Sequence, residues 1–496
     1  MERVKKVLFY ALIAVIFLFG IYLRLKLYLY NRPLWADETY LFDNIFNKGY
    51  LDLFGHLSFI QTAPPLFLII EKFLIVHFDL KEQVLRFFPF ICALLSVPLF
   101  YMFSKTFFKS RLALLISNLL FAVNVQLIFY SQELKQYSSD VFFFLLLFII
   151  LNKFSLKDMG RKEIIIYILL CGIIPLVSLP SYFVIGAWIL RELFIYKKES
   201  VKKLFFINIP LLIITAVYLK VTLFLQYSYF KPIFIRLWGN GFLSLNMKNN
   251  FRLLNHNLNY FFGPNPISAI HFILLGSGIY LLFRKIKEKE NLLLFLTIFM
   301  FLLCSALQLY PLYERVCLYT LPILIIFFVK IFDAQIPLNK IFVPVLLVVF
   351  ALSFKSYNLS YFENCSDSKI WELHNHNEFD SSNARDLMKI LKSKYHPYDT
   401  IIYNNPSIGE YKYYKTYFNF NPELEIEISS IPANLSEAVY PLLYLLKPNK
   451  TYWFFYSADY TTYDIEAIKL IVLAKHKILY QKRIEGSYLL YIKTHE

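Results

Sequence analysis

Charged residues are scarce in this chain of 496 residues, at 17% of the sequence, whereas soluble globular proteins carry about 25%. Hydrophobic residues make up 58% of the sequence. They come in long blocks, such as residues 7–28 and 292–307, which suit the thickness of a bilayer core. A water-soluble protein could not bury so many apolar segments. The composition therefore predicts an α-helical, polytopic membrane protein.

Cysteine is also rare, and the five cysteines form neither a disulfide framework nor a zinc-ligand pattern. Heptads, internal repeats and low-complexity tracts are absent from the sequence. The first apolar block is too long for a signal-peptide core, and no small-residue cleavage site follows it. We therefore expect a first span that is retained in the protein.

The formal net charge of +16 does not indicate a nucleic-acid partner. Lysine and arginine gather in short runs between the apolar blocks, which is the positive-inside signature of membrane proteins. These runs are Lys105, Lys109 and Arg111; Lys197, Lys198, Lys202 and Lys203; and residues 284–289. We interpret them as cytoplasmic loops.

The apolar stretch 63–78 decides the topology. It is short and carries Glu71 and Lys72 in its middle. If it crossed the membrane, every later basic run would lie outside the cell. We therefore expect an interfacial or re-entrant helix on the outer face, preceded by an outer segment at residues 31–62.

About eleven spans follow from this choice, with a transmembrane domain at residues 1–354 and an extracytoplasmic domain at 355–496. The expected spans are 7–28, 84–104, 112–129, 139–151, 163–179, 182–196, 204–225, 267–283, 292–307, 316–332 and 341–353.

Residues 355–496, which form the C-terminal tail, are much more polar than the preceding residues. Their sequence predicts a small α/β or α+β domain. Periodicity indicates helices at 384–395 and 465–476, and strands at 400–404, 451–457, 478–483 and 487–493.

Two adjacent acids, Asp37 and Glu38, lie in the first outer segment between Trp35 and Tyr40. The aromatic neighbours suggest a segment at the membrane interface. A carboxylate beside an apolar surface is a candidate general base. The alternative is a pair of ordinary solvated carboxylates.

A second outer segment, residues 130–138, contains Glu133, Lys135 and Tyr137. Helical spacing would place Glu133 and Tyr137 on one face. Charges so close to hydrocarbon are costly, and this favours a functional role. Helix capping and snorkelling are the structural alternative.

A third candidate is Arg315, which follows Glu314 in the short turn 310–315. Arginine can bind a phosphate through two parallel hydrogen bonds, although it can equally anchor lipid headgroups. Acids from the first two outer segments, together with cations from the second of them and from the late turn, suit group transfer from a phosphate-linked donor. A base would deprotonate an acceptor hydroxyl while the cations hold the departing phosphate.

An ordered series of motifs resembles the protein O-mannosyltransferase-related superfamily, the GT-C class that includes glycosyltransferase family 39 and the lipid A aminoarabinose transferases. The series covers about the first 330 residues. Its members are Arg24, Trp35 to Glu38, Ala63 to Leu66, Arg86 to Pro89, Tyr130 to Tyr137 and Glu314 to Pro322.

The resemblance implies that Asp37 is the catalytic base, with Glu38 and Glu133 as further acids of the site. It implies that Lys135, Tyr137 and Arg315 contact the donor phosphate, and that 63–78 is a juxtamembrane helix. The late turn departs from the pattern, because it reads Glu-Arg-Val where many relatives have Arg-Tyr. The tail has no matching motif.

These observations predict an inverting hexosyl or pentosyl transferase of the inner membrane, with its active site on the extracytoplasmic side. Its donor would be a polyprenyl-phosphate sugar, and its acceptor a hydroxyl of a glycan, lipid or protein. We expect no obligatory cofactor, although Asp37, Glu38 and Glu133 offer oxygen ligands to a divalent cation.

One alternative is an oligosaccharide transferase or polymerase with a diphosphate-linked donor. Another is a lipid or sugar transporter, for which charges in mid-span and an inverted repeat would be expected.

Overall fold

A computed structural model describes residues 2–218, 220, 238–263, 268–333, 383–404, 407–428, 444–457, 476–484 and 487–495. Contacts divide the chain into two units. The helical unit comprises Met1–Leu29, Gly49–Phe73 and Arg86–Ser360, and the sheet unit comprises Tyr30–Lys48, Leu74–Leu85 and Tyr361–Glu496. The expected domain boundary at 354/355 lies outside the described residues and stays a prediction.

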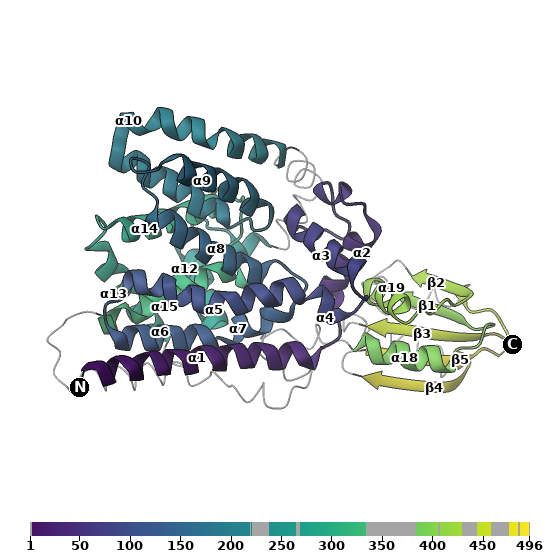
Figure 1. Cartoon of the computed structure of the whole chain (residues 1–496). Helices are drawn as coiled ribbons and strands as arrows, with labels where there is room; N and C mark the ends of the chain where they lie inside the picture. The colour runs from purple at the N-terminus through teal and green to yellow at the C-terminus, as the bar shows by residue number, and fades with distance from the viewer. Residues whose placement is uncertain are drawn as a thin grey trace. The chain divides into compact units, whose positions relative to one another are not determined.

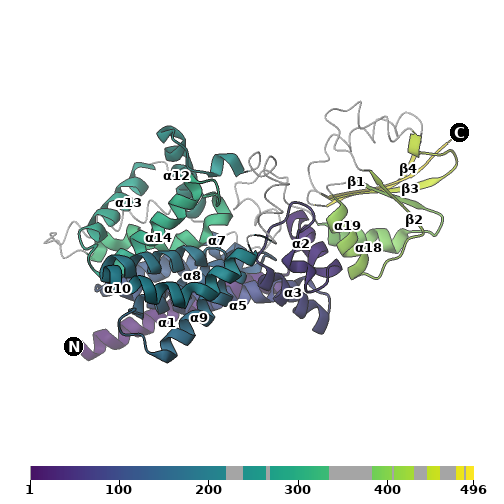
Figure 2. The ribbon, with the colours of Figure 1, turned by 90° about the horizontal axis from the view of Figure 1, so that it is seen from above.

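The helical unit is built from apolar helices that pack along one another (Figures 1 and 2). In this unit α5 packs against α6 and α8, α10 packs against α8, α9 and α14, and α13 packs against α15. The helices in chain order are α1 (Glu2–Tyr30), α3 (Pro65–His77), α5 (Phe87–Phe107), α6 (Arg111–Val123), α7 (Val125–Phe129), α8 (Tyr137–Lys153), α9 (Arg161–Ile173), α10 (Ser181–Tyr218), α12 (Met247–Phe262), α13 (Ser268–Phe283), α14 (Lys289–Ala306) and α15 (Leu321–Val329).

Several of these helices are long and apolar enough to cross a membrane. Among the described residues they are α1, α5, α14 and the segment Glu314–Asp333 that contains α15, and α6 with the helix after it forms a bent pair of the same character. The chain is therefore a multi-pass membrane protein, as predicted. The count of about eleven spans stays a prediction, because other expected spans are shorter helices and 341–353 lies outside the described residues.

Helix α10 covers the expected span 182–196 and, as far as Tyr218, the described part of the expected span 204–225. The Thr215 hydroxyl donates to the Tyr182 hydroxyl oxygen over 3.1 Å, although a straight helix would separate residues 33 positions apart by about 50 Å. The helix therefore turns back on itself and forms two arms. The lysine-rich run lies between them, as the charge pattern predicts.

The expected span 112–129 is broken at Asn124, which the sequence analysis did not anticipate. The Asn124 side chain accepts the Leu127 amide at 3.0 Å and so begins α7, while α6 and the following helix meet at 48°. The Arg24 guanidinium of α1 donates to the Ala122 carbonyl at 2.8 Å. A cation at a helix C-terminus is favourable, because carbonyls there lack intrahelical partners.

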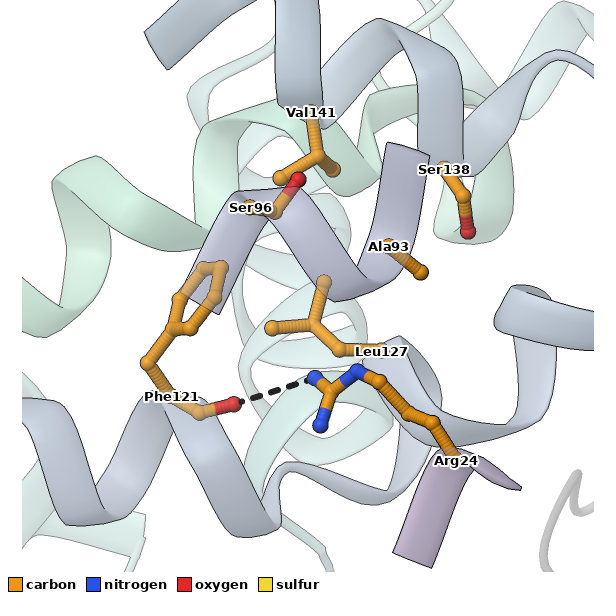
Figure 3. A pocket seen from close by; sticks show the side chains of 7 residues that line it. All are labelled: Arg24, Ala93, Ser96, Phe121, Leu127, Ser138 and Val141. Carbon is orange, nitrogen blue, oxygen red and sulfur yellow. Dashed lines mark hydrogen bonds between the residues drawn. The ribbon is translucent and has the colours of Figure 1, made fainter. Parts of the chain in front are cut away.

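The Arg24 guanidinium borders a small pocket between α1, α5, α6, α7 and α8 (Figure 3). Its lining comprises Arg24, Ala93, Ser96, Phe121, Leu127, Ser138 and Val141. The pocket encloses about 180 Å³ of space, which includes open solvent. We interpret it as packing space around the buried guanidinium.

The segment 63–78 forms the helix α3, which lies outside the set of described helices long enough to span a membrane, and its interfacial placement stays a prediction. Its Glu71 is fully buried, and neither carboxylate oxygen has a hydrogen-bond partner among the described residues. Burial raises the pKa of the Glu71 carboxyl well above its usual value of 4.5. This acid therefore holds its proton in the folded protein over a pH range in which the unfolded chain loses it.

Replacing Glu71 by methionine is expected to stabilise the protein as the pH rises above 4.5. Above that pH the unfolded chain binds fewer protons than the folded one, so the wild-type protein loses stability and the methionine variant does not. Thermal unfolding in detergent between pH 4.5 and 8 measures the difference. A gap between the two proteins that stays constant with pH would contradict the prediction.

The sheet unit contains a five-stranded sheet in the order β2-β1-β3-β5-β4. Strand β1 pairs in parallel with β2 and β3, and β5 pairs antiparallel with β3 and β4. Helices α18 and α19 lie on one face of this sheet (Figure 2). The elements are α2 (Ala36–Asn47), α4 (Glu82–Leu85), α18 (Ala384–Lys394), β1 (Thr400–Asn404), α19 (Ile408–Tyr417), β2 (Leu424–Ile428), β3 (Thr451–Ser457), β4 (Lys477–Ile484) and β5 (Ser487–Lys493).

Successive side chains along a strand point to opposite faces of the sheet, and side chains are buried on both faces. Ile402, Phe454 and Leu490 pack on one face. On the other face Tyr411 of α19 stacks on Tyr403 with ring centroids 4.2 Å apart. The predicted small α/β domain is thus confirmed, including its four expected strands and the helix at 384–395. The sequence analysis missed β2 and α19, and the expected helix 465–476 lies outside the described residues.

Candidate active site

Asp37 and Glu38 both lie in the first turn of α2, a helix that the sequence analysis did not expect. The Glu38 carboxylate is fully buried, whereas Asp37 is half-buried. Oε2 of Glu38 accepts the Trp35 amide at 3.4 Å and lies 3.4 Å from Nη2 of the buried Arg32. Glu38 thus stabilises the start of the helix, while Asp37 remains accessible to a reactant.

Replacing Glu38 by glutamine is expected to lower the free energy of unfolding by about 3–5 kcal/mol, because it removes the charge that faces the buried Arg32 guanidinium. Thermal unfolding in detergent measures this loss. Glu427→Gln is the matched control, since Glu427 is exposed on β2 of the same unit. Full stability with lost activity would instead give Glu38 a catalytic role.

The second outer segment is only partly helical. A short 3-10 turn covers Tyr130–Gln132, Glu133 has extended backbone angles, and α8 begins at Tyr137. The expected helical face shared by Glu133 and Tyr137 is therefore wrong. The break in the helix arises because the chain turns here between two apolar helices.

Glu133 and Lys135 are both buried. The Lys135 ammonium donates to Oε1 of Gln61 at 2.6 Å, so the second outer segment is tied to the chain just before α3. A buried lysine beside a carbonyl oxygen holds a positive charge at a fixed place. That arrangement suits the binding of an anionic group.

The late turn carries Arg315, whose guanidinium carbon lies 6.0 Å from the ring centre of Tyr137. This contact brings together two of the three predicted phosphate ligands. The neighbouring Glu314 has a positive φ of 45°, and its carboxylate lies 2.9 Å from the His256 imidazole. The turn is therefore tightly constrained.

Helix α12 holds this turn in place. The Asn257 side chain donates to the Leu312 carbonyl at 2.8 Å and accepts the Glu314 amide at 2.9 Å. The His256 ring stacks on Tyr313, with ring centroids 4.8 Å apart. The sequence analysis assigned no helix to this region, although the polar spacing of Asn250, Asn257 and His256 along an amphipathic segment could have indicated one.

A pair of tyrosines joins α12 to the second outer segment. The Tyr130 and Tyr260 hydroxyls lie 2.5 Å apart, and the Tyr130 ring meets the Tyr137 ring edge-on at 5.2 Å. Burial raises the pKa of both hydroxyls well above the usual value, the nearby Glu133 raises it further and the nearby Arg315 lowers it. The helical unit thus gathers Glu133, Tyr137 and Arg315 around buried phenols, and the sequence analysis did not identify this tyrosine pair.

Asp37 and Glu38 belong to the sheet unit, whereas Glu133, Lys135, Tyr137 and Arg315 belong to the helical unit. A single pocket formed by all six stays a prediction. Within the part of the chain that the structure describes, no group of three or more histidine, cysteine or acidic side chains is arranged to hold a metal ion.

No protein-family model matches the chain, and no curated protein matches it in sequence. Solved structures do match over almost its whole length. ArnT from Cupriavidus metallidurans in the apo state aligns with a TM-score of 0.54 and 11% identity over 99% of this chain and 98% of that chain. The same enzyme bound to undecaprenyl phosphate aligns with a TM-score of 0.51 and 10% identity over the same shares.

The archaeal oligosaccharyltransferase AglB from Archaeoglobus fulgidus, in complex with an inhibitory peptide and a dolichol-phosphate, aligns with a TM-score of 0.46 and 11% identity over 98% of this chain and 74% of that chain. The ArnT alignments show that this chain has the GT-C fold. The fold expected from the ordered motifs is confirmed.

Proposed function

We propose that the chain is an inverting glycosyltransferase that moves a sugar from a polyprenyl-phosphate donor to a hydroxyl of an extracytoplasmic glycan, lipid or protein. The observation that carries the proposal is the half-exposed Asp37 at the start of α2, beside a buried Glu38, in a chain with the fold of ArnT. The undecaprenyl phosphate bound to ArnT supports the class of donor.

In the proposed reaction Asp37 accepts the proton of the acceptor hydroxyl, and the hydroxyl oxygen attacks the anomeric carbon of the donor sugar. The bond between that carbon and the phosphate oxygen breaks, and its electron pair leaves with the polyprenyl phosphate. A single displacement of this kind inverts the anomeric centre. The helix dipole of α2 favours the anionic form of Asp37 before the transfer.

Lys135 and Arg315 are proposed to stabilise the negative charge that grows on the leaving phosphate. Both cations have fixed positions, because Lys135 is buried against Gln61 and Arg315 lies over Tyr137 in a constrained turn. Charges that are already in place require no rearrangement during the reaction. The apolar helices of the same unit would bind the polyprenyl tail within the bilayer.

Protein in lipid nanodiscs, supplied with a labelled polyprenyl-phosphate sugar and an acceptor glycan or lipid extract, tests the proposal. We expect label in the acceptor, inverted anomeric configuration and release of polyprenyl phosphate, all unchanged by a chelator. Transfer only from a diphosphate-linked donor, or loss of transfer on chelation, would favour the oligosaccharide transferase. Movement of intact lipid without cleavage would indicate a transporter.

A further inference from the structure

Helix α19 of the C-terminal domain packs directly on α2, the helix that carries Asp37. The two helices approach each other tightly at Gly409. A Cβ atom there would lie 2.5 Å from Oγ1 of Thr39 and 2.9 Å from the Tyr40 ring, so only glycine fits without a shift of α2. Thr39 and Tyr40 follow Asp37 by two and three residues, and the Phe42 ring also meets the Tyr413 ring edge-on at 4.7 Å.

A hydrogen bond from the same helix fixes the chain on the other side of Asp37. The Leu34 amide donates to the Tyr414 hydroxyl oxygen over 2.8 Å, and both groups are buried. The Tyr414 hydroxyl in turn donates to Oε1 of Glu82 at 3.5 Å. Because a buried backbone amide needs an acceptor, Tyr414 determines where the chain enters α2.

Helix α18 supplies a further anchor. The Arg385 guanidinium donates to the Asn31 carbonyl at 2.9 Å and forms an ion pair with the fully buried Glu82 at 3.3 Å. Asn31 has a positive φ of 53°, which asparagine tolerates better than most residues. The turn before α2 is therefore held by a side chain more than 350 positions away in the sequence.

We propose that the C-terminal domain positions the proposed catalytic base, with Arg385, Gly409 and Tyr414 as positioning residues. This inference rests on the proposed function, because it takes Asp37 to be the base. The anchors flank Asp37 at Asn31, Leu34, Thr39 and Phe42, and leave its carboxylate partly exposed. A displacement of about 1 Å in a reacting group can slow a reaction by about 100-fold, so such anchors control the rate.

Tyr414→Phe tests the hydrogen bond. We expect faster amide exchange over residues 31–47 and a fall in kcat of about tenfold or more, with an unchanged KM for the donor, whose proposed phosphate ligands lie in the helical unit. Tyr395→Phe is the matched control, since the Tyr395 hydroxyl also accepts a backbone amide, that of Glu423, at 3.0 Å. It should leave exchange over residues 31–47 and kcat unchanged.

Gly409→Ala tests the close approach of the two helices in the same two assays. Gly276→Ala is its control, because a Cβ atom at Gly276 would meet nothing within 4 Å. We expect Gly409→Ala alone to lower kcat and to increase exchange over residues 31–47, while the β3 and β5 strands keep their protection.

Unchanged amide exchange in both test variants would overturn the anchoring. Increased exchange with an unchanged kcat would show that the anchoring of α2 does not affect catalysis. A fall in kcat that only matches a loss of folded protein would show the same. A wild-type protein without transfer activity, or an active Asp37→Asn variant, would overturn the proposed role of Asp37 instead. In that case the exchange data alone would still decide whether the domain anchors α2.

Discussion

Replacing Asp37 by asparagine is expected to reduce transfer from a polyprenyl-phosphate sugar by about 10²–10⁴-fold, the usual contribution of a general base. Asparagine has nearly the same shape, so α2 should remain intact, but its amide cannot accept the hydroxyl proton. Because the proposed phosphate ligands are untouched, donor binding should persist. Initial rates and donor binding in nanodiscs measure the two effects separately.

Asp43→Asn is the control for this variant. Asp43 lies in the same helix, and its carboxylate accepts only a local bond from the Asn47 side chain at 2.9 Å in the described structure. We expect wild-type transfer from it. Undiminished transfer by a folded Asp37→Asn protein would remove Asp37 from the mechanism.

Replacing Lys135 by glutamine is expected to lower kcat/KM for the lipid-linked donor by about 10²–10³-fold, as for other fixed groups that stabilise transition-state charge. The glutamine amide can donate a hydrogen bond to Gln61 once the Gln61 side chain moves about one bond length towards it, so a tie between the second outer segment and the chain before α3 can still form. Only the positive charge disappears. Thermal unfolding should therefore stay close to that of the wild type.

Lys285→Gln is the matched control for charge removal. The Lys285 side chain is exposed, and its ammonium is 3.9 Å from the exposed Glu288 carboxylate, so we expect little change in rate. If the Lys135 variant retained the wild-type kcat/KM, the lysine would be a structural tie to Gln61 and no phosphate ligand.

The sequence predicted features that depend on neighbouring residues. Short continuous apolar runs indicated the strands at 400–404 and 451–457, and lysines between two apolar blocks indicated the two arms of α10. In each case the signal lies within about twenty residues, which is the range of hydrophobic periodicity and membrane topology rules.

The sequence could not separate the roles of Asp37 and Glu38, because burial depends on contacts between distant segments. The Arg32–Glu38 ion pair forms only where the chain turns into α2, and the Tyr414 bond to the Leu34 amide joins residues 380 positions apart. Helix α12 was missed for a similar reason. Its amphipathic spacing could have indicated a helix, but no local pattern shows that its polar residues bond to the late turn.

The bond between Arg24 and the carbonyl of Ala122 has a consequence for the biogenesis of the protein. Arg24 lies near the C-terminal end of α1 (Glu2–Tyr30), and its acceptor lies 98 residues later in the chain. Helix α1 therefore enters the membrane before its carbonyl partner has been synthesised. The contact between α1 and the end of α6 therefore forms only after the residues up to Ala122 have been made.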